Sequence, residues 1–338
     1  MTAVSVIIVN YNGSSLLQEC LDSLREQTMK DFEVIFVDNA SSDGSVEFVC
    51  RNYPEVKVIV SRTNLGYGGG NNLGIQEASG GHIVLLNNDT KADPRWLEFL
   101  VATAESDPEA GMCASKIMNY YEPETIDNTG LIMYRDGVAR GRGRLEKDTG
   151  QYDAVEEVFF PSGCAGLYRR EMLDQIGALD EDFFLYVDDV DIGLRGRLAG
   201  WRCLYAPSAV VYHKYSATTE PYSRLKAYLV ERNRIWVVMK YFPLPMAAAS
   251  ICHTFRRYLL QAYGASTGKG AGGRFLKSAS LPEVAGTLLR SYGAAFLASG
   301  KMLRKRRAAM RLKRVSNREF SRWFDRFGIS ARELALKD

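Results

Sequence analysis

Near its N-terminus the chain reads VSVIIVNYN (residues 4–12), a short apolar run that stops in polar residues. A run of this length predicts a buried strand, and leucines at helical spacing follow it. Strands are also predicted at 34–37, 56–60 and 83–86. Strands that alternate with helices predict an α/β fold with a doubly wound, mostly parallel sheet and helices on both faces.

The helix boundaries follow from capping residues. Ser42 or Asp43 is expected to cap a helix that ends at Cys50, and Pro94 suits the first turn of the next helix. Residues 122–160 have weak periodicity and predict irregular β structure or loops. The elements predicted next are two helices and two short strands, at 171–176, 188–199, 203–205 and 210–212. Beyond residue 222 the pattern is mostly helical, with a glycine-rich break at 264–273.

Composition excludes several classes of protein. The 338 residues are 46% hydrophobic, 25% charged and 11% aromatic, which excludes a disulfide miniprotein, a collagen-like repeat and a disordered chain. The net charge of +3 hides two unlike parts. Residues 1–230 hold 21 basic and 34 acidic side chains, whereas residues 231–338 hold 22 and 6. This asymmetry suggests chemistry in the first part and contact with an anionic surface in the second.

The cysteines and the apolar runs indicate the redox state of the thiols and whether the chain has a signal peptide or a membrane-spanning helix. The six cysteines show no CxxC or CxxH spacing, so we expect reduced, buried thiols. No basic segment precedes the first apolar run, so we expect no signal peptide. The nearest candidate for a spanning helix, residues 235–252, is interrupted by Lys240, Pro243 and Pro245. A membrane-spanning helix is therefore not favoured.

Polar residues follow the predicted strands. Asp38 ends the second strand, and Asn87, Asn88 and Asp89 end the fourth. Ligands bind at the carboxyl ends of strands in such sheets, so these residues are candidates for a nucleotide and a divalent cation. The competing interpretations are a turn or helix cap at Asp38 and an Asx turn at Asn87–Asp89.

A glycine-rich stretch, NLGYGGGNNLG at 64–74, has two interpretations. Its backbone N–H groups could approach a phosphate, or the stretch could form a tightly packed turn. It matches neither the GxGxxG nor the GxxxxGK[ST] fingerprint, which disfavours a nicotinamide-dependent oxidoreductase.

The stretch FFLYVDDVD at 183–191 places three carboxylates within four positions behind aromatic residues. Like-charge proximity and desolvation raise carboxyl pKa values toward the range of a general base. Acidic residues in the first turn of a helix are the alternative. His213, at the end of a predicted strand, is a candidate metal or phosphate ligand or a structural histidine.

Taken in order, these motifs resemble family 2 glycosyltransferases of the GT-A fold, particularly bacterial rhamnosyltransferase-type enzymes of surface polysaccharide assembly. The resemblance covers about residues 3–235. The matching segments are 4–12, 37–45, 64–74, 85–90, 163–170, 177–191, 195–202 and His213.

The resemblance assigns roles to individual positions. It implies that Asp189 is the general base, and that Asp89 and His213 hold Mg²⁺ or Mn²⁺. The implied donor-binding residues are Tyr11 and Asp38 for the base and ribose, Asn64, Gly66 and Asn72 on the diphosphate side, and also Asn87 and Asn88. The implied residues on the sugar and acceptor side are Gly163, Cys164, Ala165, Asp188 and Asp191.

Three positions depart from the family pattern. Asn87 replaces the first acid of the DxD motif, which weakens the expectation of a metal. Asn71 stands where many members have arginine, and Asp188 replaces the glutamate of a Glu-Asp pair. None of these changes removes the implied base.

The implied function is inverting transfer of a sugar from dTDP-rhamnose or a UDP-sugar to a hydroxyl of a glycan, with a lipid-linked acceptor expected, in cell-surface polysaccharide synthesis. We expect a catalytic domain at 1–230, with nucleotide binding at about 1–120 and the acceptor side at about 121–230. The alternative is a non-catalytic subunit that binds nucleotide sugars on the same fold.

The C-terminal region, residues 231–338, is expected to be helical and to bind a membrane. Residues 235–263 combine aromatic and aliphatic side chains with Arg256 and Arg257, and residues 301–314 hold eight basic residues and no acid. Basic amphipathic segments bind anionic membranes. Nucleic acid is disfavoured because no known binding motif accompanies the cluster, and an oligomerisation face is the other alternative. We expect a cytoplasmic protein, peripheral on the inner face of the plasma membrane.

Overall fold

The computed structural model describes residues 2–214, 223–268 and 280–337. The chain divides into two compact units. Unit 1 comprises Met1–Leu131 and Gly141–Thr218, and unit 2 comprises Ile132–Arg140 and Thr219–Asp338. The sequence prediction put the boundary at residue 230 and kept residues 132–140 in the catalytic part. In the structure those nine residues group with the C-terminal helices.

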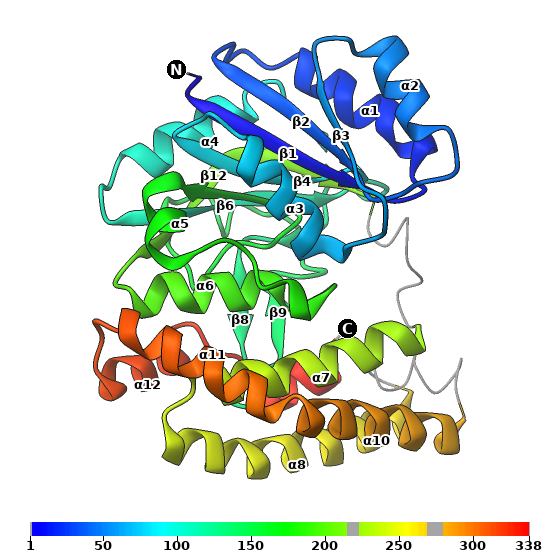
Figure 1. The fold of residues 1–338 in the computed structure, drawn as a ribbon. Helices are drawn as coiled ribbons and strands as arrows, with labels where there is room; N and C mark the ends of the chain where they lie inside the picture. The colour runs from blue at the N-terminus through cyan, green and yellow to red at the C-terminus, as the bar shows by residue number, and fades with distance from the viewer. Residues whose placement is uncertain (1, 215–222, 269–279, 338) are drawn as a thin grey trace. The chain divides into compact units, whose positions relative to one another are not determined.

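Unit 1 is built around a ten-stranded sheet (Figure 1). Its elements are β1 (Val4–Asn10), α1 (Ser14–Arg25), β2 (Phe32–Asp38), α2 (Ser45–Asn52), β3 (Lys57–Val60), α3 (Gly66–Glu77), β4 (His82–Asn87), β5 (Thr90–Ala92), α4 (Trp96–Glu105), β6 (Ala110–Asn119), β7 (Ile126–Asn128), β10 (Glu156–Glu157), β11 (Ala165–Arg169), α5 (Arg170–Ile176), the 3-10 turn η1 (Glu181–Phe183), α6 (Asp188–Leu198) and β12 (Arg202–His213). A hairpin, β8 (Leu131–Met133) and β9 (Ala139–Gly141), lies outside the sheet.

The sheet has the order β10-β12-β6-β11-β4-β1-β2-β3, with β5 and β7 added beside β12 and β6. β1 runs parallel to both β2 and β4, and β11 runs antiparallel between β4 and β6. In register, Asn10 lies opposite Asp38, and Val9 lies opposite Asn87. The helix-covered sheet predicted from the sequence is therefore confirmed, as a mixed sheet in which β4, β1, β2 and β3 are parallel and their polar ends meet at one edge.

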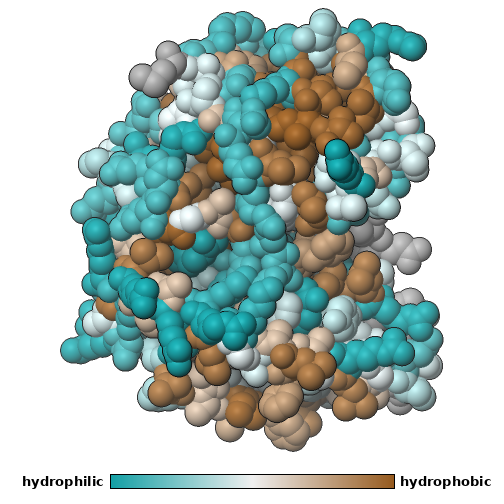
Figure 2. All heavy atoms as spheres, viewed as in Figure 1, coloured by the Kyte–Doolittle hydropathy of each residue, from teal (hydrophilic) through white to brown (hydrophobic). Residues whose placement is uncertain are grey.

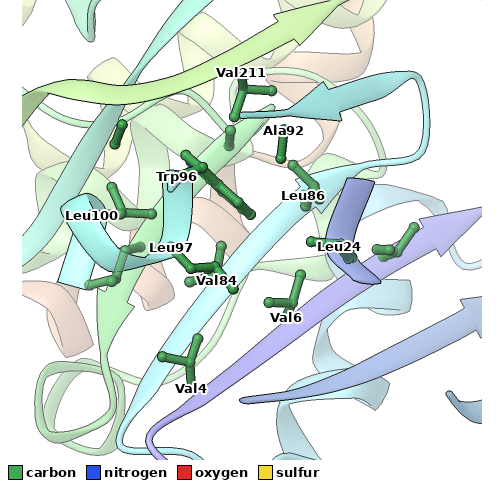
Figure 3. Packing of buried hydrophobic residues seen from close by; sticks show 14 of the residues in the cluster. Val4, Val6, Leu24, Val84, Leu86, Ala92, Trp96, Leu97, Leu100 and Val211 are labelled. Atoms are coloured by element: carbon green, nitrogen blue, oxygen red, sulfur yellow. The ribbon is translucent and has the colours of Figure 1, made fainter. Parts of the chain in front are cut away.

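Both faces of β1 are buried, which explains its unbroken apolar run. Val4, Val6 and Ile8 belong to a core that α1 and α4 cover (Figure 3). The alternate residues Ile7 and Val9 face α3 on the other side of the sheet.

The glycine-rich stretch is a helix, which corrects the prediction of a loop or turn. A Cβ on Gly70 would lie 2.6 Å from Val9 Cγ1, and one on Gly74 would lie 2.4 Å from Ile7 Cγ2. The glycines therefore let the helix backbone approach β1 more closely than any side chain would allow. Close packing compensates for the low helix propensity of glycine.

Other boundaries also differ from the prediction. The two short strands expected after residue 202 form the single strand β12, which has a bulge between Ala206 and Val210. α2 begins after Gly44, whose φ of +81° favours glycine. Asp43 still accepts a hydrogen bond from Ser45 N, at 3.2 Å. Pro94 precedes α4, which begins at Trp96.

All six cysteines are free thiols, as expected, but two of them are not buried. Cys50 on α2 and Cys252 on α8 are exposed, whereas the other four cysteines are buried. Burial of every thiol was therefore a wrong expectation. Both exposed thiols lie on helix faces that do not enter a core.

Unit 2 consists of the tip of the β8–β9 hairpin and helices. They are α7 (Arg224–Tyr241), α8 (Leu244–Thr267), α10 (Leu281–Leu297), α11 (Ser299–Leu312), α12 (Asn317–Arg326) and α13 (Ala331–Leu336). α8 continues through Gly264 and ends at Thr267, with Gly268 in the left-handed conformation as its C-cap, so the helix ends within the predicted glycine-rich break. Residues 269–273 of that break lie outside the described residues. Within the described ranges, no helix has the length and apolarity needed to cross a bilayer.

A buried ionic cluster organises unit 2. Arg257 Nε lies 2.6 Å from Asp136 Oδ2 on the hairpin tip, and Arg257 Nη1 lies 2.8 Å from Glu231 Oε1 on α7. Arg234 Nε binds the other oxygen of Glu231 at 2.5 Å. Burial disfavours the carboxylate, but the two guanidinium groups lower the pKa of Glu231 to about 2. The cluster links the hairpin tip to α7 and α8.

Gly74→Ala tests the packing of α3 on β1. Alanine gains about 1 kcal/mol of helix propensity, but overpacking against the fully buried Ile7 costs up to about 3 kcal/mol. We expect a net loss of unfolding free energy and a lower Tm by calorimetry. Gly286→Ala on α10, where no atom lies within 4 Å of the new Cβ, is the control and should not lower Tm. Equal behaviour of the two variants would refute close packing.

Candidate active site

The Asn10 side chain joins the ends of three strands. Its Nδ2 donates to Asp38 Oδ1 at 3.3 Å, and its Oδ1 accepts from Asn88 Nδ2 at 2.7 Å. Asp38 is buried, and its second oxygen accepts from Ser41 N at 2.8 Å. The loops after β1, β2 and β4 are therefore held together at the carboxyl edge.

Tyr11 follows Asn10 and is 48% exposed. The loop beyond it is fixed by Asn12, which has a positive φ of 50° and whose N donates to Ser41 Oγ at 2.8 Å. Tyr11 offers an exposed aromatic ring, and the buried carboxylate of Asp38, which binds the adjacent Asn10, offers a hydrogen-bond acceptor. These are the groups that a nucleoside needs.

Asp89 and His213 meet because β5 pairs with β12, with Thr90 opposite His213. His213 Nε2 lies 3.3 Å from Asp89 Oδ1. No hydrogen bond of acceptable geometry reaches that buried oxygen in the part of the chain that the structure describes.

Asp127 on β7 orients the histidine ring. Its Oδ2 lies 2.7 Å from His213 Nδ1, and its Oδ1 accepts from Arg144 Nη1 at 2.8 Å. Burial disfavours the charged imidazole, but Cys164, the Asp127 carboxylate that binds Nδ1 and the neighbouring Asp89 carboxylate together raise the pKa of His213 well above its ordinary value. A carboxylate behind a histidine is a common arrangement beside a metal ion.

The segment from Gly163 to Ala165 contacts both Asp189 and the residues around Asp89 and His213. Gly163 N donates to Asp189 Oδ2 at 3.1 Å, and Gly163 O accepts from Tyr67 Oη at 2.6 Å. Cys164 O accepts from Asn87 N at 2.8 Å, and the Cys164 thiol interacts with His213. Ala165 begins β11 opposite Leu86. One short segment therefore connects Asp189 with Asn87 and His213.

Asp188 and Asp189 begin α6, after a strained turn. Phe184, Tyr186 and Val187 have positive φ values of 64°, 66° and 69°, and Val187 is the N-cap residue. A β-branched residue in this region is a genuine outlier. Strain of this kind persists only where the surrounding structure imposes it.

The two carboxylates are not equivalent. Asp188 is buried, its Oδ1 has no hydrogen-bond partner among the described residues, and burial together with Asp189 raises its pKa well above the ordinary value. Burial also raises the pKa of Asp189, although N–H groups of Gly163 and Val190 oppose the shift. Asp189 is thus the better stabilised anion of the pair, with a pKa shifted toward that of a useful base.

Three predicted donor-side or acceptor-side residues are engaged within the protein. Asn72 uses both ends of its amide on Leu179, at 3.0 and 2.9 Å. Asn64 Oδ1 accepts from Gly66 N at 2.9 Å at the start of α3. Asp191 is fully buried, with Oδ2 3.1 Å from Arg195 Nε. Their side chains shape the loops around the site.

Sequence reasoning missed Tyr67 and Asp127, and it gave Asn10 no role of its own. Tyr67 lies inside the glycine-rich stretch, which was interpreted through its backbone rather than its side chains. Asp127 lay in a segment with no periodicity, and only strand pairing brings it to His213. Asn10 could have been found, since it is the polar residue that ends the first strand.

The residues fit a divalent cation that also binds a diphosphate. Asp89 Oδ1 is buried without a good donor, and His213 Nε2 beside it is held in place from behind. Across the described residues, no three His, Cys, Asp or Glu side chains could hold a metal by themselves. The remaining ligands would be phosphate and water oxygens, as is usual for Mg²⁺ with nucleotides.

Comparison with known proteins agrees with this geometry. Residues 5–177, about half of the chain, match the family described as Glycosyl transferase family 2. The N-acetylglucosaminyl-diphospho-decaprenol L-rhamnosyltransferase of Mycobacterium tuberculosis is 29% identical over 263 residues, 68% of this chain and 85% of that protein. The O-antigen biosynthesis protein RfbC of Myxococcus xanthus is 27% identical over 225 residues, 64% of this chain and 17% of RfbC.

A solved structure shares the fold. The mannosyltransferase PcManGT from Pyrobaculum calidifontis, in complex with GDP-Man and Mn²⁺, has a TM-score of 0.52 at 18% identity and covers 91% of this chain and 85% of its own. The GT-A fold and the enzyme class that the motifs implied are confirmed. This chain belongs to glycosyl transferase family 2 and is a glycosyltransferase that resembles the rhamnosyltransferases of cell-wall polysaccharide synthesis.

Proposed function

We propose that this enzyme transfers a sugar, with inversion, from dTDP-rhamnose or a UDP-sugar to a hydroxyl of a lipid-linked glycan in cell-surface polysaccharide synthesis. The observation that carries the proposal is the Gly163–Cys164 segment, which contacts Asp189 through its N–H and Asn87 and His213 through Cys164. A base and a diphosphate site are thereby held by one piece of backbone. The name of the mycobacterial relative, a rhamnosyltransferase for a diphospho-decaprenol, favours rhamnose and a lipid carrier.

The donor nucleotide would lie at the carboxyl edge of the sheet. Tyr11 would stack on the base, since its ring is exposed, and Asp38, which Asn10 next to Tyr11 binds, would accept from the ribose or base. Asn88 donates a hydrogen bond to Asn10, and this contact would fix the loops beneath the nucleotide. Asn64 and Gly66 lie at the N-terminus of α3, where Gly66 N binds Asn64 Oδ1 and Tyr67 N binds Phe184 O, so they would shape the diphosphate side of the site rather than bind the phosphate through these N–H groups.

Asp89 and His213 would hold Mg²⁺ or Mn²⁺ together with the diphosphate, and a bound ion would neutralise charge on that leaving group. Asp127 keeps the imidazole in the orientation that leaves Nε2 available toward Asp89. Asn87 carries no charge where the DxD motif has an acid, so the diphosphate would supply more of the ligand set.

Asp189 would act as the general base. It takes the proton of the acceptor hydroxyl as that oxygen forms a bond to the anomeric carbon, and the bond from this carbon to the diphosphate oxygen breaks on the opposite face. One displacement inverts the configuration. Burial and the neighbouring Asp189 carboxylate raise the pKa of Asp188, and burial also raises the pKa of Asp189, so the two carboxylates would titrate as a coupled pair.

A non-catalytic subunit that binds nucleotide sugars remains the second candidate, and Asn87 is the observation that favours it. The strained turn before Asp189 opposes it, because strain is retained where geometry matters to function. We further propose a peripheral location on the cytoplasmic face of the membrane, with an anionic lipid surface and no nucleic acid as partner.

Release of free nucleotide diphosphate across a panel of donors tests the function. We expect release from dTDP-rhamnose or a UDP-sugar in the presence of Mn²⁺ and a polyprenyl-diphosphate-linked acceptor. If calorimetry shows that donors bind but none of them releases its nucleotide diphosphate, the result would favour the non-catalytic subunit.

Asp189→Asn should abolish transfer while donor binding persists, because the amide cannot accept the acceptor's proton. General-base catalysis is worth about 10²–10⁴-fold, and a loss of this size is expected in turnover. Asp174→Asn, on the exposed side of α5, removes an acid from the same unit and should leave turnover unchanged. Wild-type turnover by Asp189→Asn would exclude this residue as the base.

Asp127→Asn tests the metal site without touching a proposed ligand. Loss of the charged group behind His213 should raise the Mn²⁺ concentration for half-maximal activity by about 10–100-fold. Excess Mn²⁺ should restore most of the rate, as a metal titration would show. A lowered rate with an unchanged metal requirement would contradict the assignment.

A further inference from the structure

The helices of unit 2 carry an unusual concentration of exposed apolar side chains. Of the seventeen large hydrophobic residues exposed in the described parts of the chain, ten lie between Leu244 and Leu303. Figure 2 shows apolar side chains gathered over α8 and α10. Patches of this kind mark interaction surfaces.

Residues 235–263, which the sequence analysis treated as one apolar and basic segment, fall into a buried part and an exposed part. Trp236, Val237 and Phe242, in and after α7, are buried in unit 2. On α8, in contrast, Ile251, Phe255 and Leu259 are 72%, 64% and 56% exposed. Within residues 235–263, therefore, it is α8 and not α7 that exposes large apolar side chains to a partner.

The exposed side of α8 is almost uncharged. Its thirteen exposed residues include a single charged side chain, Arg256, and the helix contains no acid. Its opposite side carries Thr254 and Arg257, which bind within unit 2. A helix face that met only water would not be so apolar.

α10 and α11 extend this surface and give it charge. Tyr258 Oη on α8 lies 3.2 Å from Tyr292 Oη on α10, so the two helices adjoin there. Leu289 and Phe296 are 74% and 75% exposed on α10. The chain continues into α11 through Ala298 in a helical conformation.

The charge on α11 has one sign. Arg304, Arg307 and Arg311 are exposed and lie within about 100° of Leu303 around the helix axis. Between Glu231 and Glu319 the chain has one acidic residue, Glu283, which Arg224 binds at 2.8 Å. The surface is therefore apolar with a purely basic extension.

We propose that this docking face, defined by Ile251, Phe255 and Leu259 on α8, Leu289 and Phe296 on α10 and the arginines of α11, binds an anionic lipid bilayer with its helices lying in the interface. The inference deepens the proposed membrane attachment and rests on it. Apolar side chains enter the headgroup region while arginines meet lipid phosphates. A second copy of the chain fits less well, because a symmetric contact would bring the basic segments together.

Vesicle flotation of the full chain tests the docking face. Wild type should float with phosphatidylcholine vesicles that contain phosphatidylglycerol, and should be released by salt or by omission of the anionic lipid. Arg304→Gln with Arg307→Gln should weaken partitioning about tenfold or more, since each charge near the surface contributes appreciably. Phe255→Ser with Phe296→Ser should also abolish flotation.

Val155→Ser is the matched control, because Val155 is 56% exposed in unit 1 and lies outside the docking face. It should float as wild type does. Thermal melting should be unchanged in all variants, because the replaced side chains are exposed. Equal flotation of wild type and the double variants would overturn the proposal.

Two further outcomes would also overturn it. Loss of a dimer in the phenylalanine variant, seen by light scattering with flotation unaffected, would identify a second copy as the partner. Arginine-dependent binding to an oligonucleotide but not to vesicles would identify nucleic acid as the partner.

Nucleotide binding, followed by thermal shift with UDP or dTDP and Mn²⁺, separates the docking-face hypothesis from the proposed donor site. A chain that binds nucleotide but not vesicles refutes the docking face alone, and the converse refutes the proposed donor site alone.

Discussion

The peptide group of Gly163 is held from both sides, and the arrangement of the candidate active site depends on it. Its N–H binds Asp189 on α6, and its C=O accepts from Tyr67 on α3. A Cβ at Gly163 would lie 2.7 Å from the Tyr67 hydroxyl, so only glycine permits the contact. The parallel sheet brings the loops of β1, β2 and β4 together, whereas the acidic pair comes from a helix far along the chain. Gly163 and Cys164 join these two parts.

Buried charge has different meanings in the two units. In unit 2, Glu231, Arg234 and Arg257 satisfy one another, and such closed clusters hold a structure together without performing chemistry. In unit 1, Asp188 Oδ1 is buried without a hydrogen-bond partner among the described residues, and Asp89 Oδ1 is buried 3.3 Å from His213 Nε2 without forming a hydrogen bond. Uncompensated buried carboxylates are costly. Under the proposed function, a substrate, a proton or a cation would complete them.

Two compositional signals changed meaning once the fold was known. The glycines at 66–74 had suggested a phosphate loop, but the spacing of Gly70 and Gly74 serves the packing of α3 on β1. The aromatic residues at 235–263 had suggested one membrane-binding segment, but those of α7 form a core and those of α8 face outward. In both cases composition was informative, whereas the neighbouring element determined how each residue is used.

The sequence by itself determined the alternation of strands and helices, the carboxyl edge as the place of the site, and Asp38, Asp89, Asp189 and His213 as its candidates. Local periodicity and the position of polar residues after apolar strands suffice for the sheet, its edge, Asp38, Asp89 and His213, because they depend only on neighbours along the chain. Asp189 was indicated by three clustered carboxylates, and its role as base only by the family resemblance. Tertiary structure decided what depends on pairing across long separations: Asp127 behind His213, Tyr67 on Gly163, and Asn72 and Asp191 within the supporting loops. It also decided which apolar residues of the C-terminal helices are buried, because burial is a property of the partner that a helix face meets.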